Sequence, residues 1–185
     1  MRAVLLDVDE AFLAERERRG QHKLDECWEG EWHLVNPPRS WHNLLNTALF
    51  RVLVSLAEAE GLVGVCESMG LFAAEKDWRI PDQLYCRPED VIDAGVTSAE
   101  LVVEVRSSGD DSYAKLPFYA ARKVTEALIV HEDRRVELYR CREDGTMIQV
   151  EQADGSAHSD VLGCTFTSVE GLRLRVDWDS GSAEV

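Results

Sequence analysis

Hydrophobic residues recur every three or four positions between residues 40 and 56, and this spacing predicts the longest helix of the chain. Ser40 is the predicted N-cap, because its hydroxyl could accept a hydrogen bond from the first turn. Pro37 and Pro38 separate the helix from the segment before it. The apolar stripe, with the i, i+3, i+4 spacing of an amphipathic helix, consists of Trp41, Leu44, Leu45, Ala48, Leu49, Val52, Leu53 and Leu56.

Two short runs of apolar residues predict buried strands. Residues 101–105 (LVVEV) and 126–131 (EALIVH) are rich in aliphatic residues and lack the alternation of a strand with one wet face. Between them, residues 111–123 are predicted as a helix despite Pro117. Further predicted strands cover an extended segment at 62–74, the end of 78–86, a hairpin of 135–141 and 146–152, and 171–178.

The remaining segments are predicted from turn and capping residues. Residues 7–19 begin with acids and end with bases, which favours a helix that stops at Gly20. Residues 23–35 are predicted as a hairpin with Gly30 at its turn. A connector at 87–100 is expected to contain one helical turn. The chain is expected to form one compact α/β domain.

A length of 185 residues with 45% hydrophobic content suits one globular domain. The predicted division is an N-terminal helical segment at 1–24, the main domain at 25–178 and a flexible tail at 179–185. No apolar stretch reaches the roughly 18 residues of a membrane helix, so neither membrane insertion nor export is expected. The five cysteines are odd in number and far apart, which argues against disulfides and thiolate zinc sites and favours a reducing cytoplasm.

Charge bears directly on the possible partners. The formal net charge of −15 is an objection to nucleic-acid binding, which calls for clustered lysine and arginine. Residues 106–142, however, carry 8 basic against 6 acidic side chains. This block could be a positive working face on an acidic body, or part of an ordinary surface of mixed charge; both interpretations stay open.

Common catalytic motifs are missing, and an acidic pair remains as the candidate site. The chain contains no G-x-x-x-x-G-K-[ST], H-E-x-x-H or G-x-S-x-G motif. Asp82 and Glu104 lie on or beside predicted strands, and Lys115 begins a predicted helix. A carboxylate inside LVVEV is costly to bury unless a cation or strong donors compensate it. Two carboxylates with a strand carbonyl would suit Mg²⁺ or Mn²⁺.

Each of these residues also has a plainer interpretation. Asp82 follows a proline and could simply form a turn. Glu104 could lie at an exposed strand end, or pair with Arg106 or Arg79. Lys115 could be a solvated helix residue. The combination, in this order and on these elements, favours a metal site for phosphodiester hydrolysis.

An ordered set of segments resembles the Uma-two family of restriction endonucleases, a branch of the PD-(D/E)XK nuclease superfamily. Together the segments span most of the chain from about residue 25 to 176. They are residues 25–45, RIPD at 79–82, LVVEVRSS at 101–108, Lys115 with Tyr119, ALIVHEDRRVELYR at 127–140, and GLRLRV at 171–176.

The resemblance implies a restriction-endonuclease-like fold, a central mixed β-sheet flanked by helices. It further implies that Asp82, Glu104 and the backbone carbonyl of Val105 bind the metal and that Lys115 is the catalytic lysine. Members of the superfamily usually carry that lysine two residues after the second acid, where this chain has Arg106. Arginine stays protonated and cannot act as a base, so the following helix would have to supply the lysine.

Two further residues resemble family positions, and one segment departs from the pattern. Glu26 matches the first acidic motif but could equally be a solvated hairpin residue. His42 matches a histidine after the proline pair and could instead cap or pack against its helix. Pro117 in the expected helix, with Asp110 and Asp111 before it, puts the position of the lysine in doubt.

Three functional hypotheses follow. The first is a Mg²⁺- or Mn²⁺-dependent DNA endonuclease, which is expected to be a homodimer because cutting two strands favours two symmetric sites. The second is a catalytically weak or inactive nuclease fold that serves as a binding or regulatory module, in keeping with the charge of −15. The third is hydrolysis of a small phosphorylated molecule.

Overall fold

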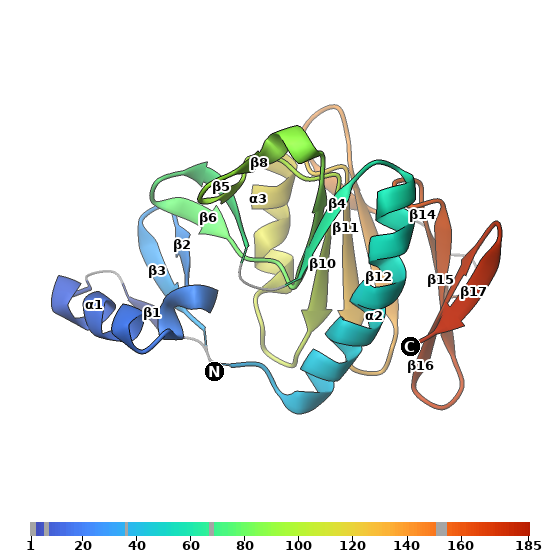
Figure 1. Cartoon of the computed structure of the whole chain (residues 1–185), viewed down its shortest axis with the longest axis horizontal. Coiled ribbons are helices and arrows are strands. Elements are labelled where there is room, and N and C mark those ends of the chain that lie inside the picture. The colour runs from blue at the N-terminus through green and yellow to red at the C-terminus, as the bar shows by residue number, and fades with distance from the viewer. Residues whose placement is uncertain (1–2, 6–7, 36, 67–68, 151–154) are drawn as a thin grey trace.

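A central mixed sheet organises the molecule (Figure 1), as seen in a computed structural model that describes residues 3–5, 8–35, 37–66, 69–150 and 155–185. Its strand order is β13-β12-β11-β10-β7-β4. β10 and β11 run parallel with Leu101 opposite Glu126, and the other neighbouring pairs run antiparallel. The six strands are β4 (Val63–Cys66), β7 (Gln83–Cys86), β10 (Leu101–Arg106), β11 (Glu126–His131), β12 (Val136–Cys141) and β13 (Met147–Gln149).

The two faces of this sheet pack against different helices. α2 (Ser40–Ala59) lays Leu45, Leu49 and Leu53 on the face that carries Val103 and Val105. α3 (Leu116–Ala121) covers the opposite face, where Phe118 and Tyr119 join the core that contains Val102. Successive strand residues point to opposite faces, so Glu104 shares the α3 face with Val102. The helical and strand patterns thus place the one charged residue of LVVEV beneath α3.

A second sheet extends from the α3 side of the molecule in the order β1-β3-β2-β6-β5-β9-β8. The hairpin predicted around Gly30 supplies the adjacent strands β3 and β2, with Cys27 opposite Trp32. Two short strands in the connector at 87–100 were not anticipated, because each has only two residues. The members are β1 (Ala3–Leu5), β2 (Glu26–Trp28), β3 (Glu31–Leu34), β5 (Gly70–Ala74), β6 (Asp77–Arg79), β8 (Val91–Ile92) and β9 (Gly95–Val96).

A third, antiparallel sheet is formed by β14 (Ser156–Ser159), β15 (Cys164–Val169), β16 (Arg173–Trp178) and β17 (Gly181–Glu184). Only β16 was predicted as a strand. The tail predicted to be flexible instead contains β17, which pairs with β16 and is held further by hydrogen bonds between Leu174 and Val185. β17 was not predicted because its residues, GSAE, form no hydrophobic pattern. Phe166 and Val176 bury this sheet against the α2 core.

Buried Glu126 fastens the third sheet to the central one. Its carboxylate accepts hydrogen bonds from the Arg140 guanidinium (Nη2, 2.8 Å), the Ser159 hydroxyl (2.5 Å) and the Asp160 amide (3.0 Å). Each of these hydrogen bonds offsets part of the free-energy cost of burying the carboxylate. Glu126, the charged first residue of EALIVH, therefore has a structural role.

The predicted helices are present with adjusted ends. α1 (Glu10–Arg18) is capped by Asp9, whose side chain accepts from Ala11 N at 3.0 Å. α2 has Arg39 as its N-cap, so the prediction of Ser40 in that role was wrong. The helix predicted at 111–123 divides into a 3₁₀ turn, η3 (Ser112–Lys115), and α3. Pro117 lies in the first turn of α3, where its missing N–H is tolerated.

The remaining short elements are η1 (Gln21–Leu24) and η2 (Pro88–Asp90). Parts of the predictions for 7–19, 62–74 and 146–152 fall on residues 7, 67–68 and 151–152, which lie outside the described residues. None of the helices in the described ranges is both long and apolar enough to cross a membrane. All five cysteines carry free thiols. The α/β prediction with a central mixed sheet is confirmed, and the domain boundaries at 24 and 178 stay predictions.

Candidate active and metal site

Glu104 meets a lysine and a tyrosine beneath α3. The Lys115 ammonium lies 2.9 Å from Glu104 Oε1 and 3.1 Å from Oε2, and the Tyr119 hydroxyl donates a short hydrogen bond to Oε1. Glu104 and Lys115 are both buried, with residue exposures of 5% and 7%. The interpretation of Lys115 as a solvated residue was therefore wrong. The cation expected to compensate Glu104 is, in this structure, an ammonium group.

Glu26 shares the same lysine from the second sheet. Its Oε1 lies 2.9 Å from Lys115 Nζ and also accepts the Ile80 amide at 2.9 Å. The Trp28 indole donates to Oε2 at 2.7 Å, and the Ile80 carbonyl accepts from Lys115 at 3.2 Å. Glu26 is only 2% exposed, so the alternative of a solvated hairpin residue was wrong. The loop that precedes Asp82 is thus tied to the acidic cluster.

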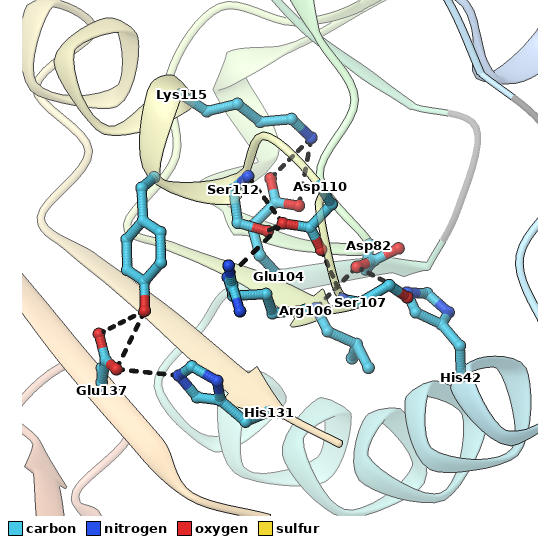
Figure 2. A network of polar contacts seen from close by, with 12 residues as sticks. His42, Asp82, Glu104, Arg106, Ser107, Asp110, Ser112, Lys115, His131 and Glu137 are labelled. Atoms are coloured by element: carbon cyan, nitrogen blue, oxygen red, sulfur yellow. Dashed lines mark hydrogen bonds and ion pairs between the residues drawn. The ribbon is translucent and has the colours of Figure 1, made fainter. Parts of the chain in front are cut away.

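Asp82 reaches the other end of the cluster through the backbone of β10. Its Oδ2 accepts the Val105 amide at 2.7 Å and lies 3.2 Å from His42 Nε2 (Figure 2). In an extended strand the N–H and C=O of one residue point to the same side, so the Val105 carbonyl lies on the side of Asp82, beyond the last partner of β7. His42, 6% exposed, is a partner of Asp82 and not merely a packing residue.

These groups open onto one pocket of about 350 Å³. Asp82, Glu104, Val105, Lys115 and Glu26 all line it, so every residue predicted from the sequence for the site lies in the same place. The interpretation of Asp82 as an isolated turn former does not account for its two partners. The other walls come mainly from the chain that leads into α2, from the loop between β6 and β7 and from the loop between β10 and η3, with one residue each from η1 and the turn after β11: Leu24, Val35, Pro37, Pro38, Arg39, Trp41, His42, Ile80, Pro81, Ser107, Ser108, Gly109, Asp110, Asp111, Ser112 and Glu132.

The electrostatics of the cluster follow from burial. The pKa of Glu104 is raised to about 7, chiefly by burial and also by the charges of Asp82 and Glu26, against the opposing effects of Lys115 and of the hydrogen bond from Tyr119. Burial alone would lower the pKa of Lys115, but the charges of Glu104 and Glu26 outweigh it and raise the pKa above its ordinary value. The lysine is therefore a permanent cation. Burial raises the pKa of the Tyr119 hydroxyl, and the charges of Glu104 and Glu26 raise it further, so this hydroxyl stays protonated.

Two opposing effects act on the pKa of His42. Burial disfavours its charged form, but the hydrogen bond and charge of Asp82, with a contribution from the Val105 backbone, raise its pKa above 6.5. A histidine that donates to Asp82 fixes the orientation of that carboxylate.

Arg106 and Arg79, the two suggested partners of Glu104, both point elsewhere. Arg106 stacks over Tyr113 with its Cζ 4.9 Å from the ring centroid, and its Nε lies 3.8 Å from Asp110 Oδ1. Arg79 lies between Trp28 and Phe118, with its Cζ about equally far from each ring at 4.3 and 4.2 Å. The usual lysine position is thus occupied by an arginine that shapes the loop at 107–111.

A cluster around Glu137 anchors the turn that carries Lys115, and sequence reasoning missed it. Tyr113, two residues before Lys115, donates to both Glu137 oxygens at 3.0 Å. His131 Nε2 lies 2.9 Å from Oε1 (Figure 2). Tyr139 donates to Oε2 at 2.9 Å. The contacts cross three elements, η3, β11 and β12, and nothing in the local sequence relates them.

The oxygen donors of the site are of the type that a hard divalent cation prefers, but they do not form a dense cluster of ligands. Within the described residues, no three His, Cys, Asp or Glu side chains form a group that could hold a metal ion. Asp82, Glu104 and the Val105 carbonyl supply oxygen ligands of the kind that Mg²⁺ uses while keeping several waters. With Glu26, Asp82 and Glu104 ionised and Lys115 protonated, the formal charge of the cluster is −2, which a divalent ion would neutralise.

Comparisons with known proteins bear on the fold and the family of this chain. A solved structure described as a putative nuclease belonging to DUF820, from Anabaena variabilis, superposes with a TM-score of 0.58 at 12% identity and covers 75% of this chain and 82% of that chain. This likeness concerns the fold. No curated protein matches the sequence. The model of the Uma2 family, described as "Putative restriction endonuclease", matches residues 9–173. The chain therefore belongs to the Uma2 family, as the resemblance to Uma-two sequences indicated, and has a nuclease fold.

Proposed function

We propose that the protein is a DNA endonuclease that depends on a divalent metal, Mg²⁺ or Mn²⁺, held by Asp82, Glu104 and the Val105 carbonyl. One observation carries the proposal: the Lys115 ammonium lies 2.9 Å from Glu104, in the pocket that Asp82 also lines. Two carboxylates with a nearby ammonium are the groups that phosphodiester hydrolysis requires. Membership of a restriction endonuclease family supports DNA as the substrate.

Each side chain of the site has a role that follows from its charge and position. When bound, a divalent ion would polarise the phosphodiester and lower the pKa of an attacking water. Asp82 is pre-oriented by His42 and the Val105 amide. Lys115, whose pKa is raised, cannot take up a proton at neutral pH; it orients the water and stabilises negative charge that develops on the phosphate. Glu26 holds the ammonium in place.

Cleavage of plasmid DNA by the purified protein tests the proposal. We expect nicking with Mg²⁺ or Mn²⁺ and none in EDTA. Asp82→Asn and Glu104→Gln should each lower the rate at least 100-fold, because each removes a charged ligand. Glu89→Gln, at an exposed position on η2 that does not line the pocket, is the matched control. Equal cleavage by the control and both site variants would refute the assignment.

A second candidate, a non-catalytic binding module, is favoured by one observation. Both oxygens of Glu104 already accept from Lys115, and Tyr119 adds a third donor, so the cluster is satisfied without a metal. Titration calorimetry with Mn²⁺ separates the two candidates. Absence of both binding and cleavage would support the module, whereas binding that Asp82→Asn abolishes would support the nuclease. A homodimer stays a prediction, which sedimentation equilibrium would test.

A further inference from the structure

The walls of the pocket differ in charge, and this difference suggests how a substrate enters. The floor and the loop side are acidic, with Glu26, Asp82, Glu104, Asp110, Asp111 and Glu132 all lining the pocket. The fixed cations among the lining residues are Lys115 and Arg39. A phosphodiester carries negative charge at every phosphate, so an acidic mouth repels it unless a cation receives it.

Lys115 is not available for binding at the mouth. It is 7% exposed and is held by Glu104, Glu26 and the Ile80 carbonyl. Arg39 differs in each respect. It is exposed, and within the described part of the chain no ion pair or hydrogen bond of its side chain is found. Of the two cations, Arg39 is therefore the one with free donors.

The position of Arg39 on α2 is unfavourable for the helix itself. It occupies the N-cap, with φ −72° and ψ 156°, and makes no side-chain capping hydrogen bond. Asn, Asp, Ser and Thr are preferred there, and a cation lies against the positive end of the helix dipole. Residues that violate such local rules are concentrated at functional sites. Helix stability gives no reason for an arginine here, whereas the pocket beside it does.

We propose that Arg39 binds a phosphate of the nucleic-acid substrate at the mouth of the pocket. This inference rests on the proposed function and deepens it by naming the group that receives the substrate backbone. A guanidinium can donate two parallel hydrogen bonds to one phosphate. The contact is independent of base sequence, since phosphates carry none. Arg39 lies outside the basic block at 106–142, so charge counts along the chain do not reveal it.

Equilibrium binding as a function of salt tests the role of Arg39 separately from catalysis. The probe is a fluorescein-labelled 20-base-pair DNA duplex, measured by anisotropy with Ca²⁺ in place of Mg²⁺. Each phosphate contact contributes about −0.9 to the slope of log K against log salt concentration. Arg39→Gln should make the slope less negative by about 1 and weaken binding about tenfold at low salt. Arg39→Lys should retain most of the slope with weaker binding.

The matched control is Arg51→Gln, which removes another exposed arginine from the same helix, where it borders a different groove. A slope unchanged in Arg39→Gln, or lowered equally in Arg51→Gln, would overturn the inference and leave the proposed nuclease intact. Failure of the wild-type protein to bind the duplex even at low salt would overturn both. Circular dichroism confirms that each variant is folded.

Discussion

Replacing Glu104 by glutamine removes a carboxylate that the fold buries, and the change should alter how stability depends on pH. Burial raises the pKa of Glu104 from 4.5 to about 7, so between these values the folded protein binds a proton that the unfolded chain has released. Stability then falls as pH rises through this window. The contribution of Glu104 is fully present below pH 4.5 and is lost by about pH 7. Glutamine does not titrate, so the variant lacks this loss.

The magnitude follows from the two pKa values. One pH unit corresponds to about 1.4 kcal/mol, so the full loss is about 3 kcal/mol. The sequence pI is near 4.7, and solubility is poor there, so measurements should begin at pH 5.5. Between pH 5.5 and 7.5 the free energy of unfolding of the wild type should fall by about 2 kcal/mol relative to Glu104→Gln.

Urea unfolding in EDTA, followed by tryptophan fluorescence, measures this difference. The analysis uses the variant minus the wild type at each pH, because other titrating groups cancel in that difference. Glu89→Gln should run parallel to the wild type. If the difference in free energy of unfolding between Glu104→Gln and the wild type changes by less than about 0.5 kcal/mol from pH 5.5 to 7.5, the reasoning is refuted. Glu104 would then have the same protonation state in the folded and the unfolded chain.

Three further predictions concern the neighbours of this residue and the junction between sheets. Lys115→Met should destabilise the fold by about 3–5 kcal/mol, because Glu104 and Glu26 lose their buried cation; urea unfolding at pH 8 measures it, and a loss below about 1 kcal/mol would contradict the buried pair. His42→Gln should cost most below pH 6.5 and little above the raised folded pKa of His42, since the stabilisation by the charged ring is lost as pH rises; the same assay at pH 6 and 9 checks the sign. Glu126→Ala should cost about 3–5 kcal/mol, and faster amide hydrogen exchange across β14 and β15 would show that the third sheet has loosened, whereas unchanged exchange would refute its role as an anchor.

The elements that the sequence predicted are those in which buried apolar positions recur regularly along the chain. α2 has its apolar stripe on one side, and β10 and β11 are apolar on both faces because α2 and α3 cover the two faces of the sheet. β17 was missed because its exposed residues carry no apolar pattern. β14 and β15 were missed because no prediction was made for residues 153–170. The two-residue strands β8 and β9 exist only through their partners.

In the candidate site, too, only the part that one local segment of sequence determines could be predicted. A carboxylate within LVVEV must be compensated, and this physical requirement was enough to single out Glu104. The identity of the compensating group depends on contacts between residues far apart in sequence. Lys115 faces the sheet because Tyr113 anchors η3 to Glu137, 24 residues later. Such a contact has no periodicity, so no pattern within the sequence could predict it.

The same cluster explains why a metal and a proton should compete at this site. With its acids ionised, the group of Glu26, Asp82, Glu104 and Lys115 carries a net charge of −2. Burial and, after it, the charges of Asp82 and Glu26 raise the pKa of Glu104, so without a metal ion this carboxylate binds a proton more readily than a solvated one. A divalent ion would remove the need for the proton, so metal affinity should increase as pH rises through 7. The lysine neutralises one of the three negative charges, and under the proposed function a divalent ion would neutralise the other two.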